Sequence, residues 1–181
     1  RRDLRIQDNR SLAACLEQSE GVLPIFVFND EQTDATKNKY FSAPAFNFML
    51  ESLADLKLQF QKQNAQLYFA RGDSKEVMAQ IKKNYDIDAV FVAEDYTPFS
   101  RGRDEKLQEE CLALGIDFVS TEDLLLNSPR KIASGSGDPY RVFTPFRNRC
   151  QLEPVSKVTN VDGSVKWLAS TMEADVYSYS D

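Results

Sequence analysis

The residues of this 181-residue chain that could bind a ligand fall in three loops, which lie at residues 1–9, 28–30 and 94–103. Each loop is expected at the carboxyl edge of a β-sheet, and the helix that Pro44 begins starts near the second. Ligands of open α/β sheets bind outside this edge, so the loops form one candidate site. Its candidate residues are Arg2, Asp8, Asn9, Val27, Phe28, Asn29, Phe46, Asp95 and Arg101.

Arginine and carboxylate side chains define the chemistry of this candidate site. The guanidinium of Arg2 can stack on an aromatic ring system or pair with an anionic oxygen. The alternative interpretation is structural, with Arg2, Asp8 and Arg101 forming ion pairs that tie the loops together. The residue types allow both interpretations.

The absence of histidine narrows the possible reactions. The sequence contains no His and three widely spaced cysteines, Cys15, Cys111 and Cys150. It therefore excludes Ser-His-Asp and Cys-His catalysis within these residues, and it argues against a metal site or a disulfide framework. Scattered cysteines suit a reducing compartment, so we expect a cytoplasmic protein, or a nuclear or organellar one in a eukaryote.

The overall charge and hydropathy restrict the partners. A net charge of −6 argues against a DNA-binding surface that covers the whole domain. No run of 18 apolar residues is present, so no transmembrane helix is expected. Further charge follows Arg1 at once, which argues against a cleavable signal sequence.

Short apolar runs alternate with helical patterns along the first 120 residues. Four runs are predicted to be strands, at residues 21–29, 65–70, 88–94 and 116–120. Helices are expected after an N-cap at Asp8, from Pro44, over 74–85, and through Leu107, Cys111 and Leu114 until Gly115. This alternation predicts βαβ units and a parallel sheet.

The beginning of the sequence bears on the order of the strands. RRDLRIQDNRSL is a polar loop that leads into a helix, with no strand ahead of it. The first strand of a doubly wound sheet is usually central. We therefore expect an apolar strand to precede Arg1. The predicted fold is α/β: a Rossmann-like, doubly wound, parallel five-stranded sheet with helices on both faces.

The stretch SGSGDPYRVFTPFRNRC, residues 134–150, is predicted to be a rigid connector. Pro139 and Pro145 restrict their own φ angles and bias the residues before them toward extended backbone. Three apolar side chains are expected to pin the connector to the domain, and three arginines to face solvent or a partner: Val142, Phe143 and Phe146, and Arg141, Arg147 and Arg149. The last thirty residues resemble a linker, partly ordered by Trp167 and Leu168.

Three motifs together carry a family resemblance: RRDLRIQDNRSL, DYTPFSRGRDEKL at 95–107, and SGSGDPYRVFTPF. In this order and spacing they resemble the N-terminal domain of the DNA photolyase/cryptochrome family. The resemblance implies an antenna-binding α/β domain at residues 1–150. It also implies that residues 151–181 are a linker toward a helical FAD-binding domain outside this chain.

The resemblance implies a role in light-driven DNA repair. In that family, reduced FAD in the helical domain passes an electron to a pyrimidine dimer, and the N-terminal domain holds an antenna chromophore. This chain would then be the antenna domain of a cyclobutane pyrimidine dimer photolyase, a carbon–carbon lyase, and would not be catalytic alone. Its implied partners are the helical domain of the parent chain and, through it, damaged DNA, with no membrane and no metal.

The identity of the antenna is left open by the sequence. The nine candidate residues match positions of the family's deazaflavin site, but Thr97 stands where those members carry an acid, and Phe46 where they carry a basic residue. Folate-type members have Asn-Glu where this chain has Phe99-Ser100. The chromophore is therefore undecided among a deazaflavin, a folate and another flavin, or absent.

Three alternatives stand beside this interpretation. A cryptochrome-type blue-light photoreceptor domain would share the same N-terminal half. A stand-alone nucleotide-binding module would carry a glycine-rich phosphate loop after an early strand, and the early turns contain none. An interaction module would dock a partner through Arg147, Arg149 and an exposed apolar patch around Phe143 and Phe146.

Overall fold

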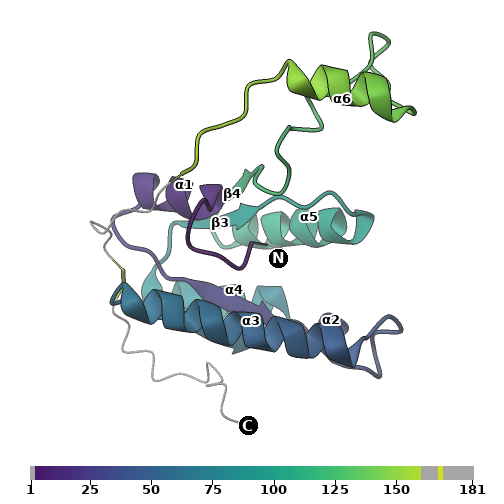
Figure 1. Cartoon of the computed structure of the whole chain (residues 1–181). Helices are drawn as coiled ribbons and strands as arrows, with labels where there is room; N and C mark the ends of the chain where they lie inside the picture. Colours follow the sequence, from purple (N-terminus) through teal and green to yellow (C-terminus); the bar gives the residue numbers. More distant parts are fainter. Residues whose placement is uncertain (1–2, 160–166, 169–181) are drawn as a thin grey trace.

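The computed structural model describes residues 3–159, 167 and 168 (Figure 1). The strands are β1 (Ile25–Phe28), β2 (Tyr68–Arg71), β3 (Ala89–Ala93) and β4 (Asp117–Thr121). The helices are α1 (Arg10–Gln18), α2 (Asp30–Thr33), α3 (Ala43–Lys62), α4 (Ser74–Tyr85), α5 (Pro98–Ala113) and α6 (Phe143–Gln151). The four predicted strands are confirmed, as are the predicted helix ahead of them and the three predicted helices between them, whereas α2 lies where a loop was expected.

Side-chain caps set where the helices begin. The N-cap of α1 is Asn9, whose side chain accepts a hydrogen bond from the Leu12 N–H, so the predicted cap at Asp8 is wrong. Asp8 has a left-handed φ of 51°, which places the extended cap geometry one residue later. Thr97 caps α5 in the same way, and Gly115 follows that helix with a φ of 66°.

The strands form two parallel pairs, β1 with β2 and β3 with β4. Ile25 lies opposite Tyr68 in the first pair, and Ala89 lies opposite Asp117 in the second. The parallel strands and the α/β, Rossmann-like fold are confirmed. The predicted sheet of five strands included a central strand ahead of Arg1, and without that strand it leaves two pairs among the described residues. The strand expected ahead of Arg1 would lie between β1 and β3, and it stays a prediction.

Two apolar clusters cover opposite faces of β1. Phe26 and Phe28 pack in a cluster with Leu53, Leu56 and other residues of α3. Alternate residues of a strand point to opposite faces, and Ile25 and Val27 pack in the second cluster, built on α4. That cluster also contains Val90 of β3 and Leu107 of α5, so it joins the two pairs of strands. Helices on both faces are thereby confirmed.

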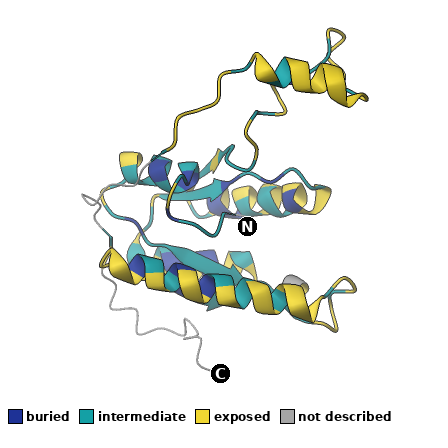
Figure 2. Cartoon of the chain, in the orientation of Figure 1, coloured by how far each residue is buried: buried dark blue, intermediate teal, exposed yellow. Residues whose placement is uncertain are grey.

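The connector differs from its prediction. Residues 143–151 form α6, which has no buried residue, and the side chain of Phe143 is 71% exposed. The expectation that Val142, Phe143 and Phe146 pin this segment to the domain is therefore wrong (Figures 1 and 2). Pro145 is tolerated because it lies in the first turn, where backbone N–H groups have no partner within the helix.

Two further features bear on the predicted organisation. Among the described helices, none is long and apolar enough to cross a membrane. The domain boundary at residue 150 stays a prediction, and most of the expected linker, residues 160–166 and 169–181, lies outside the described residues.

Candidate functional site at the carboxyl edge of the strands

A small recess lies where β3 and β4 end. It is lined by Asp3, Arg5, Ala93, Glu94, Asp95, Asp123 and Leu124, and its volume is about 10 Å³, roughly the room that one water molecule needs. The lining residues come from the N-terminal loop, from the last residue of β3 and from the two loops that follow β3 and β4. The N-terminal loop thus meets the carboxyl edge of the sheet, as the sequence predicted.

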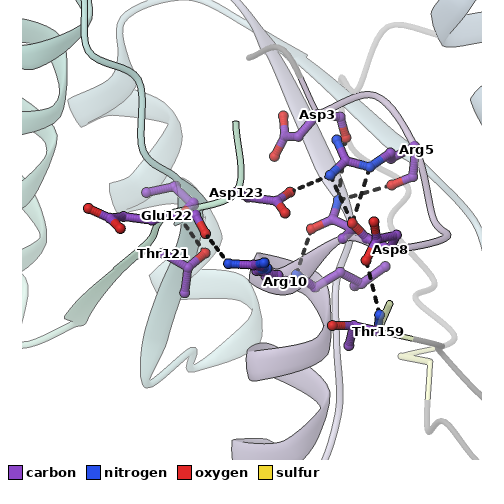
Figure 3. A network of polar contacts seen from close by, with 11 residues as sticks. Asp3, Arg5, Asp8, Arg10, Thr121, Glu122, Asp123 and Thr159 are labelled. Carbon is purple, nitrogen blue, oxygen red and sulfur yellow. Dashed lines mark hydrogen bonds and ion pairs between the residues drawn. The ribbon is translucent and has the colours of Figure 1, made fainter. Parts of the chain in front are cut away.

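An ion pair between Arg5 and Asp123 crosses this recess (Figure 3). The Arg5 guanidinium lies 2.8 Å from Asp123, whose side chain is 4% exposed. The same guanidinium donates two hydrogen bonds, at 2.8 and 3.2 Å, to the backbone oxygen of Asp8. Sequence reasoning missed this pair because its candidate loops were the N-terminal loop and the loops after β1 and β3, and the loop after β4, which contains Asp123, was not among them.

Burial controls the protonation of Asp123. Desolvation raises the pKa of this carboxyl above its ordinary value of 3.8, and the positive charge of Arg5 offsets part of that rise. With a raised pKa, the folded chain keeps the proton at pH values where the unfolded chain has lost it. The stability that Asp123 contributes is therefore fully present below pH 3.8 and is lost as the pH rises through the folded-state pKa.

The substitution Asp123→Asn should reveal this pH dependence. We expect the free energy of unfolding of the wild type, relative to the variant, to fall as the pH rises from about 3.5 toward neutrality. Urea unfolding at a series of pH values measures the difference, and carboxylates common to both proteins cancel. A difference that instead rises with pH would show that the ion pair outweighs burial.

A second arginine bridges the ends of β3 and β4 from outside the recess. Arg130 places one nitrogen 2.7 Å from Glu94 and another 2.7 Å from Glu122. Burial and the charges of these two carboxylates raise the pKa of the neighbouring Tyr96. Since Arg130 is exposed, this bridge is screened by solvent and its contribution to stability is small.

The nine predicted site residues take up different tasks in the structure. Among those that are described, Asp95 lines the recess, and its Oδ1 accepts from the Tyr96 N–H at 2.7 Å. Asn9 and Asn29 cap helices α1 and α2. Asp8 accepts a hydrogen bond from the backbone of Thr159.

The remaining predicted residues are aromatic, apolar or basic. Val27 and Phe28 pack in the two apolar clusters, and the ring of Phe46 lies 5.6 Å from that of Phe41. Arg101 is exposed on α5, and Arg2 lies outside the described residues. The structure therefore brings Asp95 to the recess and places Phe46 and Asn29 elsewhere, so the role of the nine residues in chromophore binding stays a prediction.

The charge of the recess determines what it can bind. Asp3, Glu94, Asp95 and Asp123 line the recess together with the guanidinium of Arg5. Two of these carboxylates already have a cation, because Asp123 pairs with Arg5 and Glu94 pairs with Arg130. Carboxylates accept hydrogen bonds, so the recess favours a group that presents N–H or O–H donors and disfavours a phosphate. Among the described side chains, no three His, Cys, Asp or Glu residues are grouped so as to hold a metal ion.

Comparison with known proteins assigns the chain to a family. The sequence profile of the DNA photolyase family matches residues 1–161. The deoxyribodipyrimidine photo-lyase of a Synechococcus species is 33% identical over 155 residues, which are 85% of this chain and 31% of that protein. Cryptochrome-1 of Aedes aegypti is 31% identical over 143 residues, which are 76% of this chain and 26% of that protein.

Solved structures agree with the sequence comparison. An archaeal photolyase from Sulfolobus tokodaii, crystallised with two FAD molecules, aligns with a TM-score of 0.78 and 34% identity over 92% of this chain and 36% of its own. A Synechocystis cryptochrome, 18% identical, shares the fold with a TM-score of 0.80, and the alignment covers 92% of this chain and 35% of its own. The chain thus spans about a third of such relatives, and in the photolyases it matches their N-terminal part.

The three motifs, the parallel strands with helices on both faces and these likenesses agree: the chain belongs to the DNA photolyase family and corresponds to the N-terminal α/β domain of its members.

Proposed function

We propose that this chain holds an antenna chromophore for a light-driven DNA-repair enzyme, a cyclobutane pyrimidine dimer photolyase. The chromophore passes excitation energy to an FAD in a second, helical domain of the parent protein, and that domain binds the damaged DNA. The observation that carries the proposal is the acidic recess at the carboxyl edge of the strands in a chain of this family.

We favour a flavin or deazaflavin ring as the chromophore. Such a ring presents an N–H group that a carboxylate can accept, and the pterin ring of a folate does the same, so the lining of the recess does not separate them. The structure of the Sulfolobus tokodaii photolyase, with its two FAD molecules, implicates a novel light-harvesting cofactor in that relative and supports the same choice. The ring must reach the recess from its rim, because the recess itself has room for about one water.

The proposal is tested by titrating the purified chain with three probes: riboflavin, a deazaflavin and a reduced folate. We expect one flavin-type probe to bind at one molecule per chain, and Asp95→Asn to weaken that binding about tenfold, the effect of losing a hydrogen bond to a charged group. Chromophore absorbance and fluorescence give the dissociation constants.

The matched control is Asp86→Asn, which makes the same change of charge at the opposite edge of the sheet, just ahead of β3. Asp86 is 95% exposed, and its variant should bind the probes as the wild type does. If none of the three probes binds the wild-type chain, the antenna role is wrong. Equal losses in both variants would indicate a general charge effect and would remove Asp95 from the site.

A photoreceptor is the second candidate function, because proteins named cryptochrome match this chain with identities close to those of the photolyases. The antenna proposal applies to both. Repair of cyclobutane dimers under blue light by the full-length protein distinguishes them, since a photosensor would leave the lesions intact.

A further inference from the structure

The chain returns to the α/β domain after α6 and contacts it at two separated places. The first contact is made by Thr159, and the second by Trp167 and Leu168. Both lie beyond β4 by more than thirty residues, so they are tertiary contacts of the segment after α6 and not part of a βαβ unit. Neither depends on a chromophore.

The first contact is a pair of hydrogen bonds with Asp8 (Figure 3). The Asp8 N–H donates to the backbone oxygen of Thr159, and the Thr159 N–H donates to Oδ1 of Asp8, each at 3.0 Å. Asp8 has a left-handed backbone, and the guanidinium of Arg5 donates to its carbonyl oxygen. Asp8 thus pairs with the returning chain much as a strand residue would.

The second contact anchors an aromatic ring. Trp167 forms a parallel bridge with Val22, and the Leu168 N–H donates to the Val22 oxygen at 3.0 Å. The indole packs edge-on against Phe60, with ring centroids 5.3 Å apart, and joins the apolar cluster of α3. Leu168 lies over Gly21, and a Cβ at Gly21 would come within 2.7 Å of a terminal methyl of Leu168, so that side chain would have to shift.

We propose that these two contacts act together as a strap, and that the task of Asp8 is to hold the returning chain and not to contact a chromophore. The strap fixes α6, which has few other attachments. Asn127 donates to the Cys150 oxygen at 3.4 Å, and Arg149 donates to the Lys131 oxygen at 3.2 Å. Together with the strap, which follows α6 in the sequence, these contacts hold the helix while its own apolar side chains stay exposed.

Trp167 is the single tryptophan of the 181 residues, so its fluorescence reports directly on the strap. The decisive variants are Asp8→Gly, which keeps the left-handed backbone and loses the acceptor, and Asp8→Asn, which keeps both. In Asp8→Gly we expect Trp167 emission to shift to longer wavelength, acrylamide quenching to rise, and the Thr159 amide to exchange its hydrogen roughly tenfold faster. Asp8→Asn should resemble the wild type.

The reverse experiment asks whether the contacts are coupled. Trp167→Ala should also speed hydrogen exchange at the Thr159 amide, although the substitution lies eight residues away. An unchanged tryptophan signal in Asp8→Gly would overturn the proposal, as would unchanged Thr159 exchange in Trp167→Ala. Equal changes in Asp8→Asn and Asp8→Gly would show that Oδ1 is not the holding group. These readouts need no chromophore, so they are separate from the test of the antenna function.

Discussion

Replacing Phe60 with alanine is expected to lower the free energy of unfolding by about 3–5 kcal/mol, the usual cost of truncating a buried phenylalanine. Phe60 is 4% exposed at the end of α3, where it packs with Leu56 and Ala65. The substitution leaves a cavity between α3 and β2, and it removes the ring on which Trp167 rests. The cavity and the lost contact with Trp167 both destabilise the folded state, so their contributions to the free energy of unfolding add.

Urea unfolding followed by circular dichroism measures this loss. The matched control is Phe48→Ala on the same helix, because the Phe48 side chain is 71% exposed and its truncation should change stability by no more than about 0.5 kcal/mol. Equal effects of the two substitutions would mean that the α3 cluster does not form the core of the domain.

Replacing Arg5 with alanine is expected to destabilise the chain by about 2–4 kcal/mol at neutral pH, since it leaves Asp123 buried without its cation. The figure is below that of a fully buried pair because the Arg5 side chain is 39% exposed. The variant also loses two hydrogen bonds to the Asp8 oxygen. Without Arg5, the pKa of Asp123 rises further, so the destabilisation should shrink in acid as that carboxyl becomes neutral.

The control for Arg5→Ala is Arg130→Ala, which removes an arginine from an exposed bridge between Glu94 and Glu122. This loss should be within about 1 kcal/mol. Combining Arg5→Ala with Asp123→Asn completes a double-mutant cycle, in which the second substitution should recover part of the stability lost in the first. A cycle with no coupling would show that the pair contributes nothing.

The sequence predicted the four strands and the helices between them because each is determined by local pattern. Apolar runs such as that around Val90 need burial on both faces, and the spacing of Leu53, Leu56 and Phe60 is helical. The carboxyl edge also followed from the sequence, since the ends of parallel strands must meet at one edge. For that reason Asp95 was predicted to lie at this edge, and in the structure it lines the recess.

Two predictions made from the sequence were wrong, one about the cap of α1 and one about the burial of α6. Asp8 and Asn9 are adjacent and both can cap a helix, and the left-handed backbone at Asp8 decides for Asn9. Phe143 and Phe146 are apolar and were expected to be buried, yet α6 holds them in solvent. Whether a helix is buried depends on the elements that pack beside it, and the local sequence pattern does not contain that information.

By itself, the sequence determined the strands, the helices, the resemblance to the photolyase family and the edge at which a ligand could bind, because these depend on periodicity and on short motifs. The tertiary structure alone decided that Arg5 pairs with Asp123 across 118 residues, and that Asp8 holds Thr159 across 151. It also decided that the described strands form two pairs. Such contacts join groups far apart in the chain, and only the folded path brings them within hydrogen-bonding distance.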